Sequence, residues 1–165
     1  MTHGTSLWRK VTSLVVFTSG YLRFPDGGMF PLFEIYGALA TFGQSITTND
    51  TMTGYSQDQS NVFHGFLRTR QGTITQFDDR LAGAAPYQGT LVAAINPAHW
   101  VTGAYVDGNY VYHGFVRSAG GVFTTFDVSG ATAMYSQAIN PAGAVPGYSY
   151  DQNNAAPGFL SLPRQ

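Results

Sequence analysis

The chain has 165 residues and a formal net charge of −1, and only 10% of its residues are charged, against about 25% in ordinary domains. Lys10 is the one lysine and Glu34 the one glutamate, whereas there are 20 glycines, 12 phenylalanines and 10 tyrosines. This composition argues against a mainly helical protein, a disordered chain and a basic nucleic-acid-binding protein. The absence of cysteine excludes disulfides, thiolate metal sites and a cysteine nucleophile.

The first 18 residues contain a short apolar run after Arg9 and Lys10. Thr12 and Ser13 interrupt that run, so a β-strand is favoured over a cleaved secretion signal, and the second interpretation stays open. No apolar run approaches the ~20 residues that cross a bilayer, so we expect no membrane span.

A sequence pattern recurs along the rest of the chain. Gly103 and Gly147 lie 44 residues apart, and Gly54 and Gly103 lie 49 apart, which predicts a five-residue insertion around Leu81–Gly89. The copy with the most landmarks reads Ile95-Asn96-Pro97-Ala98, Gly103, Tyr105, His113-Gly114-Phe115-Val116-Arg117, Gly121, Phe126-Asp127. Recurrent spacing of this kind indicates a repeat architecture.

One repeat contains four short candidate strands separated by turn residues. In the best copy these strands are residues 91–96, 100–106, 112–117 and 122–128. Four strands in a repeat of this length are typical of a propeller blade, so we predict an all-β fold, a partial or small β-propeller of about three and a half to four blades. The residues expected to pack between blades are Phe33, Phe66, Phe77, Phe115, Phe126 and Phe159, and the glycines expected at close backbone approach are Gly20, Gly65, Gly114 and Gly158.

The repeats predict one domain spanning residues 1–165. Its expected parts are an N-terminal strand or signal-like segment (1–18), a partial blade (19–37), a blade with the insertion (38–89), a blade (90–135) and an incomplete blade (136–162). This number suits a closed ring poorly. The alternatives are a piece of a longer protein, a distorted small propeller, or a homodimer that completes the ring.

The strings His64-Gly65-Phe66-Leu67-Arg68 and His113-Gly114-Phe115-Val116-Arg117 resemble the bacterial extracellular HAF repeat, with His-Gly-Phe in place of His-Ala-Phe. Ile95-Asn96-Pro97 and Ile139-Asn140-Pro141 are also similar to that family. The resemblance covers about residues 19–160, and the chain departs from it at Ser19 and Pro157, where histidine is expected. It implies a secreted or surface-exposed protein, a propeller fold and no established enzymatic activity.

Three series of polar residues recur with the repeat. We expect the histidines to be structural, and we expect Arg–carboxylate or His–carboxylate links to join the third strand of a repeat to the fourth. The repeat-structural residues are His64, His113, Arg68, Arg117, Asp78 and Asp127. No catalytic, metal or cofactor-binding residue is predicted, because the acids are spread one per repeat and no catalytic motif occurs. The oxygen-rich turns near Asp58 and Asp151 favour hairpins over calcium loops.

The favoured function is a non-catalytic extracellular repeat domain for binding or scaffolding, with a glycan or protein surface as partner. Its loops, the insertion above all, would form the contact surface, and the candidate ligand contacts are Tyr87, Tyr110 and Tyr112. The alternative is a fragment of a propeller hydrolase or lyase acting on glycans, which would need a cluster of polar residues that is not repeated.

Overall fold

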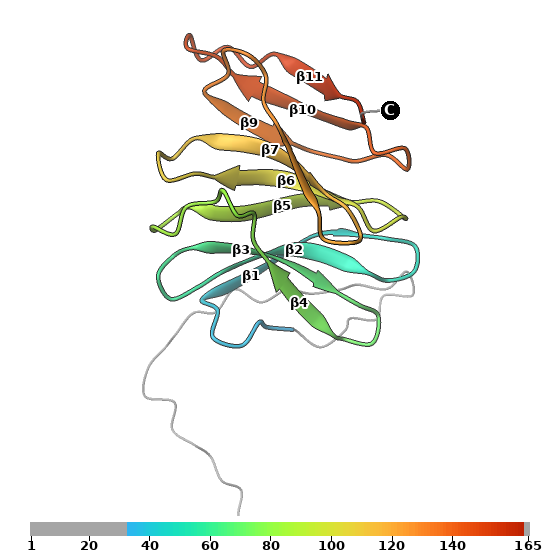
Figure 1. Ribbon diagram of the computed structural model, residues 1–165. Helices are drawn as coiled ribbons and strands as arrows, with labels where there is room; N and C mark the ends of the chain where they lie inside the picture. Colours follow the sequence, from blue (N-terminus) through green and yellow to red (C-terminus); the bar gives the residue numbers. More distant parts are fainter. Residues whose placement is uncertain (1–32, 164–165) are drawn as a thin grey trace, which may run out of the picture.

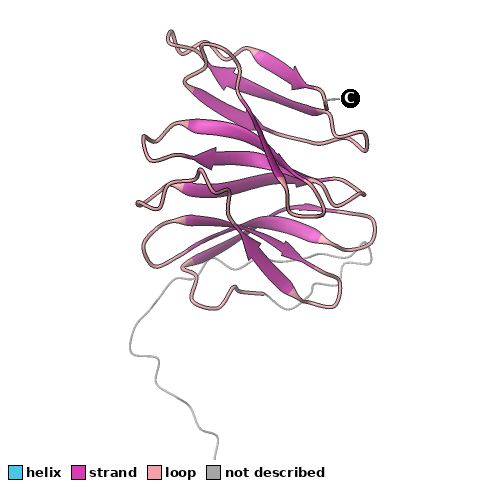
Figure 2. Ribbon diagram, in the orientation of Figure 1, coloured by secondary structure: helices cyan, strands magenta, loops and turns pink. Residues whose placement is uncertain are grey.

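The computed structural model describes residues 33–163, and it is all-β over that range, with no helix (Figure 2). The segments 1–18 and most of 19–37, for which we predicted a strand and a partial blade, lie outside the described residues. The first repeat contains β1 (Ala40–Ile46), β2 (Met52–Gln57), β3 (Phe63–Arg68) and β4 (Ile74–Phe77). The second contains β5 (Gly89–Ile95), β6 (Val101–Val106), β7 (Tyr112–Arg117) and β8 (Phe123–Phe126), and the third contains β9 (Ala133–Ser136), β10 (Val145–Tyr150) and β11 (Gly158–Ser161).

The eleven strands form one open, mixed sheet (Figure 1). Successive strands within a repeat pair antiparallel, and single parallel bridges join neighbouring repeats, at Phe63 with Gly89 and at Tyr112 with Ala133. The fourth strands β4 and β8 pair with β3 and β7 and leave the main path of the sheet. The prediction of an all-β fold is therefore confirmed. The repeats do not form separate blades, because hydrogen bonds between β3 and β5 and between β7 and β9 connect them in one sheet. Over the described residues this sheet does not close into a ring.

The four strands expected in the second repeat overlap β5 to β8. The third has the same bounds as β7, and the ends of the others differ by at most two residues. The insertion also lies where it was expected, between Gly83 and Gly89. Gly83 N–H donates to Val106 O at 2.8 Å, and Leu39 N–H donates to Gln57 O at 2.7 Å in the first repeat, so these two residues are equivalent. β1 begins directly after Leu39, whereas five additional residues separate Gly83 from β5.

Hydrophobic residues of adjacent repeats share each core cluster. Phe115 and Val101 are fully buried in the second repeat, and Phe77 and Leu67 of the first repeat pack against their cluster. A second cluster joins Phe126 to buried residues of the third repeat in the same way. The phenylalanines at the third and fourth strands therefore pack between repeats, as the sequence pattern predicted, and Phe33–Phe66 and Phe126–Phe159 both meet at 5.9 Å between ring centroids.

Two series of glycines have different causes. A Cβ at Gly54, Gly103 or Gly147 would lie within 2.3 Å of a carbonyl oxygen on the neighbouring first strand, so these positions require close backbone approach. We expected that approach at Gly65 and Gly114 instead. At these two positions an aromatic side chain packs against the glycine, because an added Cβ would meet the ring of Phe77 or Phe126 on the fourth strand. At Gly158 the nearest atom would be 3.7 Å away.

The arginines of the third strand contact rings of the preceding repeat. The Arg117 guanidinium lies 4.4 Å from the Phe77 ring centroid, and the Arg68 guanidinium lies 5.2 Å from that of Phe33. Arg117 forms no ion pair with a described residue, and its Nε is buried without a hydrogen-bond partner there. Desolvation lowers the pKa of its guanidinium below the usual value. The Arg–carboxylate link, one of the two forms that we expected, is therefore not formed by Arg117 among the described residues. Its guanidinium lies on the ring of Phe77 instead.

The third repeat lacks this arginine. Ser161 pairs with Val145 as Arg117 pairs with Val101, and Ser161 lines a 270 Å³ hollow over Phe126. Ser161→Arg should place a guanidinium on that ring and raise the free energy of unfolding by about 0.5–1 kcal/mol. Urea denaturation of the variant and of Ser161→Gln, which adds length without charge, measures the effect. Equal stability of the two variants would contradict the stacking interpretation.

Candidate functional site

An aspartate begins the turn between the second and third strands of every repeat. Asp58 Oδ1 accepts hydrogen bonds from the backbone N–H groups of Ser60 and Val62, both at 2.8 Å. Asp107 and Asp151 accept the same two bonds in their repeats, at 2.8 and 2.9 Å. The fourth residue of each turn has a positive φ, between 58° and 64°. These oxygen-rich segments are therefore hairpin turns, as expected, and the carboxylate is used to fix the turn.

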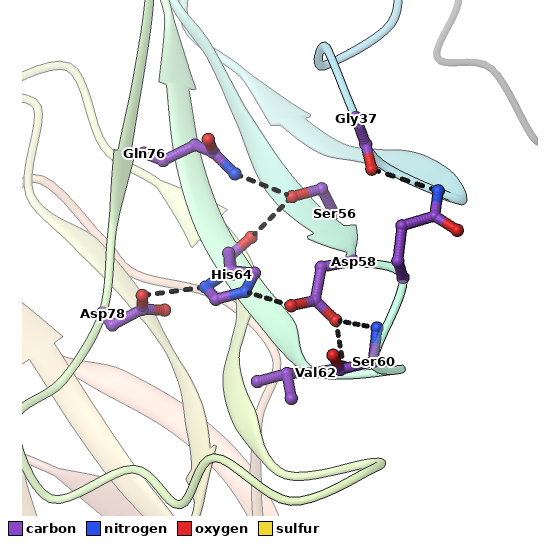
Figure 3. Close-up of polar contacts among 9 residues, drawn as sticks. Gly37, Ser56, Asp58, Ser60, Val62, His64, Gln76 and Asp78 are labelled. Atoms are coloured by element: carbon purple, nitrogen blue, oxygen red, sulfur yellow. Dashed lines mark hydrogen bonds and ion pairs between the residues drawn. The ribbon is translucent and has the colours of Figure 1, made fainter.

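The second oxygen of the turn aspartate reaches the histidine of the third strand (Figure 3). His64 Nε2 lies 3.4 Å from Asp58 Oδ2, and His64 Nδ1 lies 2.8 Å from Asp78 Oδ2, just after β4. Both ring nitrogens of His64 therefore face a carboxylate. The link expected between the third and fourth strands is present in its histidine form.

The second repeat contains the same three residues in the same arrangement. His113 Nε2 lies 3.5 Å from Asp107 Oδ2, and His113 Nδ1 lies 2.9 Å from Asp127 Oδ1. The two Asp–His–Asp clusters each join a turn, a third strand and the segment after a fourth strand. Because the same cluster recurs in both repeats, we interpret it as a structural link between the turn, the third strand and the segment after the fourth strand.

The clustered charges shift the ionisation of the first repeat's residues. Burial alone would lower the pKa of His64, but the hydrogen bonds and charges of Asp78 and Asp58 raise it above its usual 6.5. Burial would raise the pKa of Asp58, but hydrogen bonds from Val62, His64 and Ser60 hold it below 3.8. The two carboxylates thus favour the imidazolium form of His64 more than water would.

A raised folded-state pKa makes the contribution of His64 pH-dependent. The stabilisation is complete below the ordinary pKa of 6.5 and is lost as the pH rises through the higher folded value. We expect the stability difference between the native chain and His64→Gln to be largest below about pH 6.5 and to fall as the pH rises above that value, by up to about 1 kcal/mol for a partly exposed cluster. Urea midpoints below and above this pH test it, and a difference independent of pH would contradict the assignment.

A pocket of about 490 Å³ opens beside the cluster of the first repeat. Its polar lining comes from Ser56, Asp58, His64, Gln76 and Asp78, and its other wall is the segment Ile35–Ala38. Gln76 Nε2 donates to Ser56 Oγ at 3.1 Å, and Ser56 Oγ in turn donates to the backbone oxygen of His64 (Figure 3).

The contacts of Ser56 decide what chemistry the pocket supports. A serine nucleophile needs its hydroxyl on a ring nitrogen of the histidine. Here the hydroxyl points to the backbone, and both imidazole nitrogens are engaged by carboxylates. The pocket residues therefore do not form a serine–histidine nucleophile pair, and the fold holds their hydrogen-bonding groups in place.

The three tyrosines predicted as ligand contacts do not converge on this pocket. Tyr87 is 59% exposed in the insertion, where its N–H donates to Asn61 O, and Tyr110 is 55% exposed at a positive φ in the turn after β6. Tyr112 is half-buried and its ring lies 5.2 Å from that of Tyr135 in the third repeat. Tyr87 and Tyr110 remain available to a partner at their own loops.

The pocket residues Ser56, Asp58 and Gln76 were not singled out as a site from sequence. Asp58 and Asp107 each lie six residues before a histidine, and this spacing was the available signal. Within the described residues no group of three or more histidines and acids has metal-site geometry, and no helix is long and apolar enough to cross a membrane.

Comparison with known proteins gave no match to a family model, a curated protein or a solved structure.

Proposed function

We propose that the chain is a non-catalytic, extracellular repeat domain that binds a ligand at the pocket of its first repeat. The observation that carries this proposal is the pocket itself, a concave site lined by two carboxylates, an imidazole, an amide and a hydroxyl. Hydrogen bonds within the hairpin hold most of these groups before any ligand arrives, which reduces the entropy lost on binding. The extracellular location rests on the resemblance to HAF repeats.

The arrangement of the repeats supports a propeller-like arc as the finer description of the fold. In a propeller, the apolar face of each blade is covered by the next blade. Phe77 of the first repeat packs against the cluster around Phe115 of the second, and Phe126 of the second packs beside Phe159 of the third. The shared clusters are consistent with that stacking, while the parallel bridges keep the repeats in one ladder.

A homodimer through β11 is the partner arrangement that we propose. β11 pairs only with β10 among the described strands, and Leu160 and Leu162 beside its open edge are 63% and 67% exposed. An open strand edge next to exposed leucines favours pairing with another chain. Light scattering after size-exclusion chromatography should give twice the chain mass. A monomer at all concentrations would overturn this part.

Glycan and peptide arrays test the binding proposal. The blocking variant is Ser56→Tyr with Gln76→Thr, which gives the first repeat the residues that the second has at the equivalent positions Tyr105 and Thr125. Signals should be lost in this double variant and kept in Tyr110→Ala, whose exposed ring lies on another loop. Signals lost only in Tyr110→Ala or Tyr87→Ala would move the site to the loops.

A hydrolase and lyase screen on glycans tests the non-catalytic part of the proposal. We expect no turnover. Robust turnover that disappears in His64→Gln would overturn the proposal and favour the enzyme alternative.

A further inference from the structure

The second strands of the first two repeats differ at several residues. One of these differences lies beside the histidine, at the place where the first repeat has its pocket. Ser56 pairs with His64 across β2 and β3, and Tyr105 pairs with His113 across β6 and β7, so the two residues are equivalent. Ser56 leaves a pocket beside its histidine. Tyr105 is 4% exposed and its ring stacks on the His113 ring, at 4.8 Å between centroids and 19° between planes.

The wall opposite the histidine is also equivalent in the two repeats. Ala38 N–H donates to Ile35 O at 3.0 Å in the first repeat, and Ala82 N–H donates to Asp79 O at 3.0 Å in the second. Ala38 lines the open pocket, and Ala82 packs against the cluster that contains Tyr105. The Tyr105 ring thus lies on His113 within a cluster that Ala82 helps to enclose, whereas the equivalent residues His64 and Ala38 line an open pocket.

The carboxylates around the two histidines are placed alike. Burial raises the pKa of Tyr105, and the charges of Asp79, Asp127 and Asp107 raise it further, to about 12. Asp79 has no acidic counterpart at the pocket, where Ile35 holds the equivalent place. The phenol in the second repeat is thus kept neutral among carboxylates. Asp58 and Asp78 hold the corresponding places around the pocket, so an anionic ring would be repelled there and a neutral one accepted. The imidazolium of His64 favours an electron-rich ring on its face.

We infer that the pocket of the first repeat is a receptor for a neutral phenol ring, stacked on His64 as Tyr105 stacks on His113. This inference rests on the proposed function and adds the chemical class of the ligand. The ring's source is a small phenol or a tyrosine side chain of a peptide, and the hydroxyl would lie among the carboxylates as that of Tyr105 does.

The direct test uses p-cresol, which is the tyrosine side chain alone, with the native chain. Saturable shifts of the His64 ring protons in NMR are expected, and 4-methylcyclohexanol and p-cresyl sulfate, which lack the flat ring or carry a negative charge, should bind at least about tenfold more weakly. The double variant Ser56→Tyr with Gln76→Thr should lose the shifts. Absence of p-cresol binding by the native chain, or equal binding by the double variant, would overturn the inference.

Tyr105→Ser provides a test that is independent of the natural ligand. This variant should open a second pocket in the second repeat, and p-cresol should raise its melting temperature more than that of the native chain, because the ligand refills the vacated space. If Tyr105→Ser does not fold, the double variant and the native chain still decide the question. No difference in p-cresol response between folded Tyr105→Ser and the native chain would count against the inference.

The source of the ring is decided by N-acetyl-tyrosine amide and a tyrosine-containing pentapeptide. Tighter binding of the pentapeptide indicates a peptide ligand, and equal binding indicates a small phenol. If the arrays give signals that the double variant loses while p-cresol does not bind, the proposed function stands and the phenol inference fails. If p-cresol binds and the arrays stay silent, the pocket is a phenol site and the array ligands are the wrong class.

Discussion

Replacing Gly103 by alanine should lower the free energy of unfolding by about 3 kcal/mol or more, or prevent folding. Gly103 lies in the middle of β6, a strand that is buried along its whole length. A Cβ there would lie 2.1 Å from the carbonyl oxygen of Leu91 and 2.9 Å from the Cα of Val92, both on β5. Backbone atoms of a central strand cannot move aside as a flexible side chain can, so β5 and β6 would have to separate.

Gly108→Ala is the matched control, because Gly108 is in the turn that follows the same strand. Nothing lies within 4 Å of a Cβ at Gly108, so its cost should be within about 0.5 kcal/mol. Urea unfolding followed by tryptophan fluorescence compares the two variants. A small cost at Gly103 would mean that β5 and β6 lie further apart than described, and a large cost at Gly108 would point to a general intolerance of added bulk.

The strands and turns of the repeat could be predicted from sequence because their causes are local. Asn96-Pro97-Ala98 and Asp107-Gly108-Asn109 carry turn chemistry, and residues 73–78 and 122–127 alternate in hydrophobicity. The spacing of Gly54, Gly103 and Gly147 located the insertion in the same way. The packing of Phe77 and Phe126 between repeats followed from periodicity, because a residue that recurs with the repeat meets an equivalent neighbour each time.

The way in which the repeats join could not be predicted, because it depends on contacts between residues distant in sequence. The single bridges from Phe63 to Gly89 and from Tyr112 to Ala133 have no sequence signature. They turn stacked units into one continuous ladder. The same holds for Arg117, because the His–carboxylate form of the expected links is the one present and the arginine lies on the ring of Phe77 in the preceding repeat.

The candidate site could not be predicted from sequence, because its histidine recurs in the next repeat and a recurring residue indicates a structural role. His64 and His113 recur, so they were interpreted as structural, and the two clusters do hold the hairpins together. Serine occupies the equivalent position in the first and third repeats, at Ser56 and Ser149, and the second repeat has Tyr105 there. The pocket of the first repeat lies where the second repeat has this larger side chain. The space beside His64 is recognised as a site only by comparison with the second repeat, where a tyrosine ring lies on the equivalent histidine.

Phe115→Ala should destabilise the chain by about 3–5 kcal/mol, and the equivalent Phe159→Ala by about 1–2 kcal/mol. Phe115 is fully buried in the cluster that joins the first two repeats, whereas Phe159 is half-buried in β11. Truncation at Phe115 therefore removes contacts on every side and leaves a cavity between repeats, while the site at Phe159 is open to water and can relax. Urea denaturation of both variants measures the gradient. Equal costs would show that the edge-on contact between Phe126 and Phe159 excludes water as well as the junction between the first two repeats does.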